Sequence, residues 1–394
     1  MKNKLPVFVL IVLFFLGTGI FVFPQNEVSV SEKRNLATNE SIKAGDILGG
    51  SFSANVENVM KDQFYFRDSI TGFYYRLKTI LNRYLGSGKS SIDYVYLNEN
   101  VIELDDGYLI NNVLFYNEED LDIAASKGYN LNEVDLKYPE IKTYVYFPTR
   151  MEEILDVQGN SPETSNYGLG YREAFRIQLN PNITYGSLKM DGIEDHKAYF
   201  YKSDFHWNHI GAYEAYKDIV RMIGQDFEIG DPKEIAEEIC YDYEFRGNIS
   251  SQIGHLGEAD HICDYRLTDI GEHTLIADGE ETDLSGVKRE YAESGNSSQY
   301  SDYDIYFGNN YFERIFDFRQ PERPNILIFA DSYTNVYQEW LASHFNKTVI
   351  LDLRTRPEDF SLDYYVQQYD IDIFLIAQPY HDLFFNGDMF IPLN

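Results

Sequence analysis

Apolar and polar positions in the last third of the chain predict a strand, a helix and a second strand in succession. Residues 325–330 form an apolar run rich in Ile, Leu and Phe, which is typical of a buried strand. The next stretch, 334–345, places four large apolar residues on one helical face: Val336, Trp340, Leu341 and Phe345. A second apolar run at 348–351 completes the unit. This order predicts an α/β fold with a parallel sheet flanked by helices.

The rest of the chain divides by pattern into an N-terminal segment, a helical region and a large domain. We expect a membrane segment at 1–25, a spacer and helical region at 26–90, and an α/β domain at 91–394. Within the domain, residues 228–301 are acidic, rich in Gly and Ser and poorly periodic, which favours a surface insertion or lid. Further strands are predicted at 95–97, 108–110, 141–147 and 371–376, and helices within 52–85 and at 212–223.

The N-terminus carries a membrane signal. Residues 5–23 lack charged side chains and, at about 1.5 Å per helical residue, could cross a hydrocarbon core of about 30 Å. Lys2 and Lys4 precede this run, so the positive-inside rule predicts a cytoplasmic N-terminus, with everything after Pro24 outside the membrane. A cleaved signal peptide, with Gly17-Thr18-Gly19 as its small-residue site, is the alternative.

Overall charge limits the classes of partner. The formal net charge of −31 argues against nucleic acid, because a phosphate backbone must be neutralised by clusters of Lys and Arg. The same charge would be repelled by an anionic membrane surface, so membrane attachment is expected to be hydrophobic. The chain contains 33 Tyr and 27 Phe, and exposed aromatic rings of this kind can stack on sugars. Composition therefore gives weak support to a carbohydrate ligand.

The chain has two cysteines, Cys240 and Cys263. Outside the membrane they would form a persistent disulfide, and two buried thiols are the alternative. No CxxC pair is present, which argues against a structural zinc site.

Asp331-Ser332-Tyr333 lies between the first strand and the helix of the predicted unit. Ser332 is therefore expected at the carboxyl end of a strand, where open α/β sheets bind their ligands. A hydroxyl in that position, close to the amide groups that open a helix, suits an acyl-transfer nucleophile. The alternative is structural, because Asp331 or Ser332 would also serve as a helix cap.

A second group of polar residues lies far upstream. Asp204 and His206 are two residues apart, so in an extended segment their side chains point to the same side. A carboxylate beside an imidazole fixes the imidazole tautomer, and the pair can activate a serine. Trp207 could pack under the imidazole or line a sugar pocket. Two alternatives stay open: a metal site formed with His209, or a helix-capping Asp204 beside a core histidine.

Five short motifs together resemble a known family. They are Ser31-Glu-Lys-Arg-Asn-Leu36, Asp62-Gln-Phe-Tyr-Phe-Arg-Asp68, Ser203-Asp-Phe-His-Trp207, Asp331-Ser-Tyr333 and Asp352-Leu-Arg354. In this order they resemble the DHHW family of bacterial exported proteins, which is similar to the alginate O-acetylation proteins of the J and X type in the SGNH hydrolase superfamily. The chain departs from the pattern at Phe205, where the family name has a histidine, and at Ala330, where many SGNH proteins have Gly.

The resemblance implies a flavodoxin-like SGNH fold and roles for particular residues. Ser332 is the expected nucleophile, His206 its base and Asp204 the group that orients the base. Contacts to the substrate or to the oxyanion are assigned to Arg354, Trp207, Tyr333 and Asn310. For Arg354, a surface ion pair with Glu358 or Asp359 is the alternative. No metal or other cofactor is expected.

The predicted function is an extracytoplasmic serine O-acyltransferase, in particular an O-acetyltransferase, or an acetylesterase acting on hydroxyls of a cell-envelope or secreted polysaccharide. A transferase would need acetyl groups delivered across the membrane, which implies a multipass membrane partner. The alternative is a non-catalytic protein that binds glycan or serves as a scaffold in a polysaccharide-synthesis complex, because fold alone does not fix function.

Overall fold

The structure is a computed structural model of the whole chain. It describes residues 28–29, 34–38, 51–63, 67–85, 87–89, 93–98, 100–104, 106–111, 118–149, 167–294, 302–308, 310–378 and 391–392. The predicted membrane segment at 1–25 lies outside these ranges. Within them, no helix is both long enough and apolar enough to cross a membrane.

An eight-stranded sheet forms the centre of the molecule, in the order β12, β11, β13, β15, β14, β16, β7 and β8. The strands are β7 Lys142–Phe147, β8 Thr184–Ser187, β11 Thr274–Ala277, β12 Glu280–Glu281, β13 Glu313–Asp317, β14 Ile326–Ala330, β15 Lys347–Leu351 and β16 Ile373–Ala377. The five strands from β15 to β8 are parallel, which confirms the α/β prediction. An antiparallel edge formed by β13, β11 and β12 extends the sheet.

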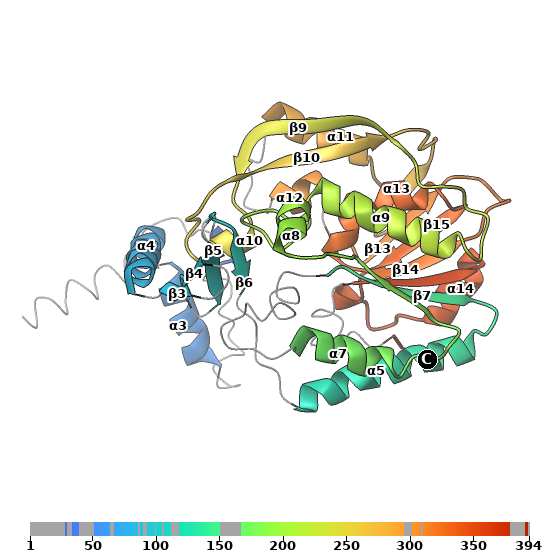
Figure 1. The fold of residues 1–394 in the computed structure, drawn as a ribbon, viewed down its shortest axis with the longest axis horizontal. Coiled ribbons are helices and arrows are strands. Elements are labelled where there is room, and N and C mark those ends of the chain that lie inside the picture. Colours follow the sequence, from blue (N-terminus) through green and yellow to red (C-terminus); the bar gives the residue numbers. More distant parts are fainter. Residues whose placement is uncertain are drawn as a thin grey trace, which may run out of the picture.

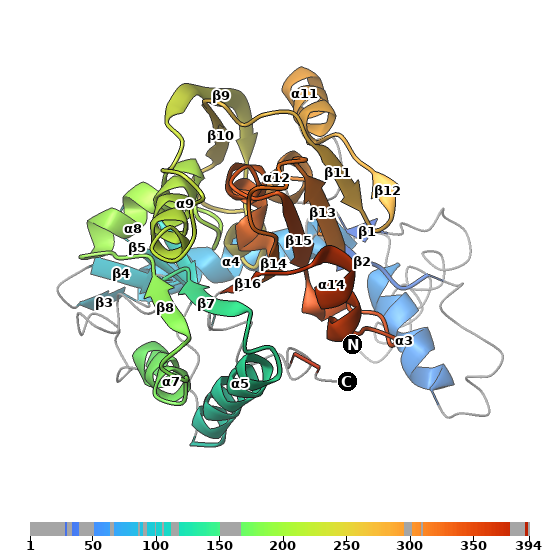
Figure 2. The same cartoon turned by 90° about the vertical axis from the view of Figure 1, so that its right-hand side faces the viewer.

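Helices cover both faces of this sheet (Figures 1 and 2). Along β14, Ile326 and Ile328 face one apolar core while Leu327 and Phe329 face the other, as the two-residue period of a strand requires. The first core is covered by α8 Ile193–Tyr199, α9 His209–Ile223, α12 Asp302–Tyr306 and α13 Gln338–Ala342. The second is covered by α5 Glu118–Lys137, α7 Tyr167–Arg176 and α14 Leu362–Tyr369.

The acidic segment 228–301 contains regular structure that was not predicted from its sequence. Its main feature is a long hairpin of β9 Ile235–Phe245 and β10 Asp260–Leu267, with the short helix α10 Asn248–Ser251 between the strands and α11 Leu284–Ser294 further on. Cys240 and Cys263 face each other across the hairpin and form a disulfide, as predicted. Most of β9 is exposed, but residues 241–245, Tyr-Asp-Tyr-Glu-Phe, alternate between aromatic and acidic side chains as a strand does.

A smaller module precedes the main domain. It contains β1 Val28–Ser29, β2 Arg34–Asn35, α3 Phe52–Asp62, α4 Arg67–Leu85, β3 Ser87–Lys89, β4 Asp93–Tyr96, β5 Val101–Leu104 and β6 Leu109–Asn111. Strands β3 to β6 form a four-stranded antiparallel sheet. Leu97, Val101 and Leu109 pack against Ile249 and Ile253, in and just after α10, so the module rests on the tip of the hairpin.

One predicted helix is replaced by two shorter elements. Residues 334–345 were expected to form a single helix, whereas the chain forms the 3-10 helix η2 Ser332–Val336 followed by α13. At the junction, the buried guanidinium of Arg314 donates hydrogen bonds to the side chains of Asn335 and Gln338. These contacts fix the segment that carries Ser332.

Candidate active site

Ser332 lies at the carboxyl end of β14, as the sequence predicted, and opens η2. The capping group there is Asp331, whose Oδ1 accepts a hydrogen bond from the Tyr333 N–H at 3.0 Å. The Ser332 hydroxyl is therefore not needed as the cap and can take another partner.

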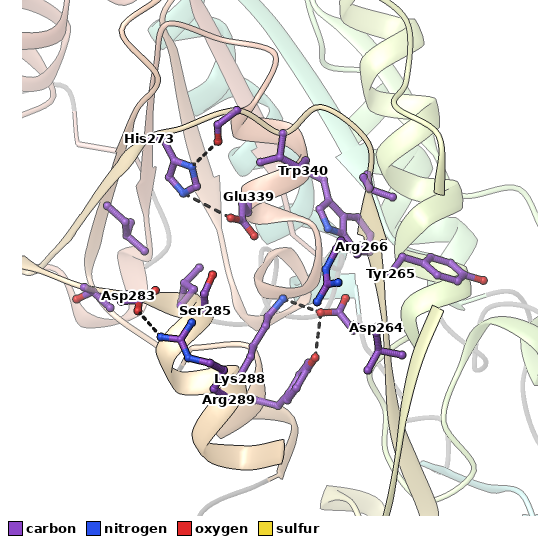
Figure 3. Close-up of a pocket in the computed structure, with 18 of the residues that line it drawn as sticks. Asp264, Tyr265, Arg266, His273, Asp283, Ser285, Lys288, Arg289, Glu339 and Trp340 are labelled. Atoms are coloured by element: carbon purple, nitrogen blue, oxygen red, sulfur yellow. Dashed lines mark hydrogen bonds and ion pairs between the residues drawn. The ribbon is translucent and has the colours of Figure 1, made fainter. Parts of the chain in front are cut away.

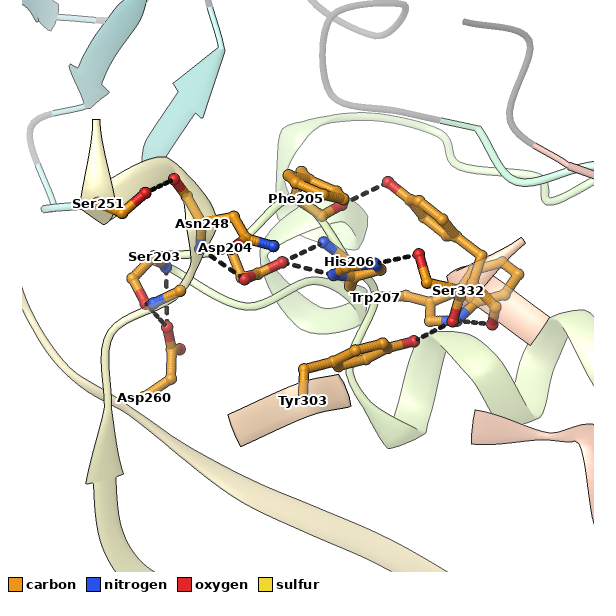
Figure 4. Close-up of polar contacts among 12 residues, drawn as sticks. Ser203, Asp204, Phe205, His206, Trp207, Asn248, Ser251, Asp260, Tyr303 and Ser332 are labelled. Atoms are coloured by element: carbon orange, nitrogen blue, oxygen red, sulfur yellow. Dashed lines mark hydrogen bonds and ion pairs between the residues drawn. The ribbon is translucent and has the colours of Figure 1, made fainter. Parts of the chain in front are cut away.

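That partner is His206 (Figure 4). The Ser332 Oγ lies 2.8 Å from His206 Nε2, and His206 Nδ1 lies 2.7 Å from Asp204 Oδ1. A carboxylate can only accept, so Nδ1 carries the proton and Nε2 is left to accept the hydrogen of the serine hydroxyl. The structure thus brings the three residues together in the expected order, with His206 in the middle; their catalytic role stays a prediction.

Asp204 is a buried carboxylate whose oxygens are both occupied. Oδ1 also accepts from the His206 backbone N–H at 2.9 Å, and Oδ2 accepts from the Asn248 N–H of α10 at 2.7 Å. Burial alone would raise the pKa of Asp204, but the charge and hydrogen bonds of His206, helped by the Asn248 N–H, outweigh burial and lower that pKa. Asp204 is therefore charged at neutral pH, as the orienter of an imidazolium must be.

A second carboxylate fixes the loop that carries Asp204. Asp260, at the start of β10, accepts from the Ser203 N–H at 2.8 Å and from the Ser203 hydroxyl, while that hydroxyl accepts from the Gly247 N–H at 2.9 Å. Burial raises the pKa of Asp260, and its hydrogen bonds with Ser203 oppose that rise. Asp260 and Gly247, near the tip of the hairpin, therefore fix the position of Ser203 and of the neighbouring Asp204.

Tyr303 of α12 contacts both His206 and the backbone of Ser332. Its ring lies flat against the imidazole, with 3.9 Å between centroids and 10° between planes, and its hydroxyl donates to the Ser332 carbonyl at 3.0 Å. Burial raises the pKa of Tyr303 well above its ordinary value, so the hydroxyl stays a neutral donor. Tyr303 was not predicted from the sequence, because the residues around it show neither a known motif nor a periodic pattern of apolar positions.

Trp207 and Tyr333, two residues predicted to contact substrate, join the loop at 205–207 to η2. Trp207 is fully buried, and its indole N–H donates to the Tyr333 carbonyl at 2.9 Å. Tyr333 is also buried, its hydroxyl donates to the Phe205 carbonyl at 2.6 Å, and its N–H is taken by Asp331. Both side chains hold the loop at 205–207 against η2. Their contact with substrate or oxyanion stays a prediction.

Arg354 and Asn310 lie in different surroundings. Arg354 follows β15 and forms a two-point ion pair with the buried carboxylate of Asp352, with Nε–Oδ1 at 2.9 Å and Nη2–Oδ2 at 2.6 Å. This carboxylate differs from Glu358 and Asp359, the partners considered from sequence. Asn310 is exposed, and its Oδ1 accepts from Asn335 Nδ2 at 3.2 Å, on the same 3-10 helix as Ser332. Asn310 remains a candidate oxyanion donor.

His209 points away from the Asp204–His206 pair. It opens α9, its Nε2 lies 2.7 Å from Glu238 Oε1 on β9, and its ring packs against Tyr265. Among the residues that the structure describes, no cluster of three or more His, Cys, Asp or Glu side chains is arranged to hold a metal ion. The metal interpretation that would join His209 to His206 and Asp204 therefore lacks the required geometry.

A separate cavity of about 1140 Å³ lies between the hairpin strand β10, helix α11 and helix α13, which all contribute lining residues (Figure 3). Tyr306 lines it, one turn after Tyr303, which contacts His206. The cations on its wall are paired with carboxylates: Lys288 with Asp264, Arg289 with Asp283 and Arg266 with Glu237. The cavity is therefore lined by aromatic side chains and by these ion pairs, in which each Lys and Arg of the lining is neutralised by a carboxylate.

Replacing Gly247 tests the support of Asp204. A Cβ at this position would lie 2.3 Å from both Cβ and Oδ2 of Asp204, so Gly247→Ala must displace the carboxylate. We expect the rate of acetyl-ester hydrolysis to fall on the order of 10²-fold, because small displacements of a catalytic group have effects of that size. Gly230→Ala is the matched control, since φ of 78° strains an alanine there without any atom within 4 Å. Equal rates in the two variants would contradict this role of Gly247.

Two substitutions separate the contributions of Tyr303. Tyr303→Phe keeps the stacked ring and loses one hydrogen bond, which should cost about 1 kcal/mol of unfolding free energy and little activity. Tyr303→Leu removes the flat surface that holds the imidazole, so we expect ester hydrolysis to fall by roughly 10- to 100-fold. Thermal unfolding checks that both variants fold. Similar activity of the Leu and Phe variants would show that stacking does not position His206.

Comparisons with known proteins bear on the fold. No protein-family model matches the chain, and no curated protein matches its sequence. Bacillus cereus PatB1, solved with a sulfonyl adduct, has a similar structure, with a TM-score of 0.61, 22% identity, and coverage of 75% of this chain and 98% of that one. A DHHW family protein from Eubacterium siraeum covers 76% of this chain and 94% of its own at a TM-score of 0.52 and 14% identity.

The O-acetyltransferase domain of Pseudomonas putida AlgJ is more distantly similar, with a TM-score of 0.40 and 12% identity. The match covers 73% of this chain and 92% of that domain, and is too weak to bear on function. The resemblance to a DHHW family protein that the motifs predicted is thus confirmed at the level of the fold. The chain shares that fold with PatB1 over 75% of its length.

Proposed function

We propose that the protein is a serine acyltransferase or esterase that acts on hydroxyl groups of a polysaccharide. The observation that carries this proposal is the continuous hydrogen-bonded series from Asp204 through His206 to Ser332. An uncharged serine hydroxyl is a weak nucleophile, and a neutral imidazole 2.8 Å away is placed to remove its proton.

In the first half-reaction, Ser332 Oγ attacks the carbonyl carbon of an acyl donor while His206 Nε2 accepts the hydroxyl proton. The charge of Asp204 stabilises the resulting imidazolium. The bond from the carbonyl carbon to the leaving group then breaks, and His206 returns the proton to that group. The product is an acyl ester on Ser332.

In the second half-reaction, His206 removes a proton from an acceptor hydroxyl, whose oxygen attacks the acyl carbon of the ester. The bond to Ser332 Oγ breaks, and the proton on His206 returns to the serine. A sugar hydroxyl as acceptor gives transfer, and water gives hydrolysis. The same three residues therefore serve both activities, and access of water to the acyl ester decides between them.

Two features support a polysaccharide acceptor. The sequence motifs resemble a family associated with polysaccharide O-acetylation, and the fold is shared with a DHHW family protein. An acetyl group is the proposed acyl group, on the ground of that sequence resemblance.

The proposed location is outside the cytoplasmic membrane, with residues 1–25 as a single membrane anchor. The uncharged run at 5–23 supports the anchor, and the Cys240–Cys263 disulfide supports an oxidising compartment. A transferase in that location has no cytoplasmic acetyl donor at hand. We therefore propose a multipass membrane protein that passes acetyl groups to Ser332.

Ser332→Ala tests the proposal. We expect hydrolysis of a chromogenic acetyl ester to fall by at least about 10³-fold, because the covalent step is lost. Ser361→Ala is the matched control: it removes the N-cap hydroxyl of α14, at a cost of about 0.5 to 2 kcal/mol, without touching the site. Adding an oligosaccharide and measuring its acetylation by mass then distinguishes transferase from esterase. Equal activity of the wild type and Ser332→Ala would refute the catalytic proposal.

A non-catalytic glycan-binding protein is the second candidate. The observation that favours it is the cavity at Lys288 and Trp340, which lies apart from Ser332. Under this alternative, neither the wild type nor Ser332→Ala hydrolyses the ester, and both bind oligosaccharide equally in calorimetry. Activity that depends on Ser332 would exclude it.

A further inference from the structure

Helix α4 exposes an apolar face. Phe73 is 67% exposed, Ile80 61% and Tyr84 89%. The exposed large apolar side chains of the helix are Ile70, Phe73, Tyr74, Leu77, Ile80, Leu81 and Tyr84. Their spacing of three or four residues places them on one side of the helix along its whole length. A contiguous apolar surface of this kind on a soluble domain marks a place where something binds.

The opposite, more polar side of α4 attaches the helix to the protein. Thr79 is buried, Asn82 Nδ2 donates to the Leu97 carbonyl at 2.8 Å, and Arg83 forms an ion pair with Glu103. A surface helix normally buries its apolar side and exposes its polar side. Helix α4 does the reverse, so its apolar side is available to a partner.

The charge of α4 differs from that of the rest of the chain. The helix has four cations, Arg67, Arg76, Lys78 and Arg83, against the single carboxylate of Asp68, a net charge of +3 in a chain of −31. Arg67 and Arg83 are paired with Asp62 and Glu103 within the protein. At about 100° per residue, Arg76 falls along one border of the apolar side and Lys78 along the other, so a cation borders the apolar stripe on each side.

An apolar stripe with aromatic residues and flanking cations is the pattern of a helix that lies in the surface of an anionic bilayer. The aliphatic stems of Arg and Lys can extend along the apolar side while their charges reach phosphate groups. An anionic bilayer repels the rest of the chain, which is strongly negative. Among the described elements, the cationic helix α4 is therefore suited to face the bilayer. The uncharged run at 5–23 precedes α4 in sequence, which is consistent with a nearby membrane.

We propose that α4 docks on the membrane with its axis in the interface and its apolar side among the lipid acyl chains. This proposal is independent of the chemistry at Ser332. Docking would also orient the candidate site, because Tyr75 of α4 packs against Gly254 just after α10, and α10 supplies the Asn248 N–H that holds Asp204. In Figure 1, α4 lies at the end of the molecule remote from α14.

A fluorescence measurement on the full chain in lipid vesicles tests the proposal. The native cysteines are joined in a disulfide, so Phe73→Cys supplies a single thiol for an environment-sensitive dye. Tyr364→Cys is the matched control, because Tyr364 is 54% exposed and lies on α14. Vesicles contain phosphatidylglycerol with phosphatidylcholine, or phosphatidylcholine alone, with and without nitroxide-labelled lipid.

We expect the dye at position 73 to shift to the blue and to be quenched several-fold more strongly by nitroxide lipid than the dye at 364, most strongly with phosphatidylglycerol. The double substitution Arg76→Glu and Lys78→Glu, placed in the Phe73→Cys chain, should reduce that quenching. Thermal unfolding confirms that each labelled protein is folded. Equal quenching at 73 and 364 would overturn the proposal and assign the apolar side to a protein partner or a second copy of the chain.

Discussion

The burial of one charged carboxylate, Asp204, sets the conditions for the rest of the site. A charge removed from water must be compensated at close range, and here the compensation comes from His206 on the same loop and from the Asn248 N–H at the tip of the hairpin. Asp204 lies so close to the backbone of Gly247 that no side chain fits at position 247. The loop, the hairpin and the imidazole are therefore fixed relative to one another by the need to satisfy this carboxylate.

The parallel sheet supplies the other half of the arrangement. Strand β14 ends at Ala330, Asp331 caps the short helix that follows, and Ser332 faces the imidazole from a rigid, buried segment. Trp207 and Tyr333 join this segment to the Asp204 loop through buried hydrogen bonds. Two pieces of chain separated by 126 positions thus meet with little freedom, which is what acid–base activation of a hydroxyl requires.

The sequence predicted the central strands, because buried strands show as apolar runs. It also predicted that Asp204, His206 and Ser332 meet, because a carboxylate, an imidazole and a serine hydroxyl have a clear chemical relation. The hairpin was not predicted: β9 is exposed on most of its length, and its alternation of aromatic and acidic residues is confined to the short stretch 241–245. Tyr303 and Gly247 could not be found either, because their importance comes from contacts between distant segments. For the same reason, the hydrogen bonds by which Trp207 and Tyr333 join the loop to η2 could not be predicted.

Reaction with a sulfonyl fluoride tests the central claim most directly, namely that Asp204 and His206 make Ser332 a nucleophile. Peptide mapping by mass spectrometry would locate the adduct, and its rate of formation would be compared in the wild type, Asp204→Asn and His206→Ala. The account predicts a single adduct on Ser332 that forms at least about 10²-fold more slowly in each variant. Labelling at another residue, or equal rates in all three proteins, would contradict it.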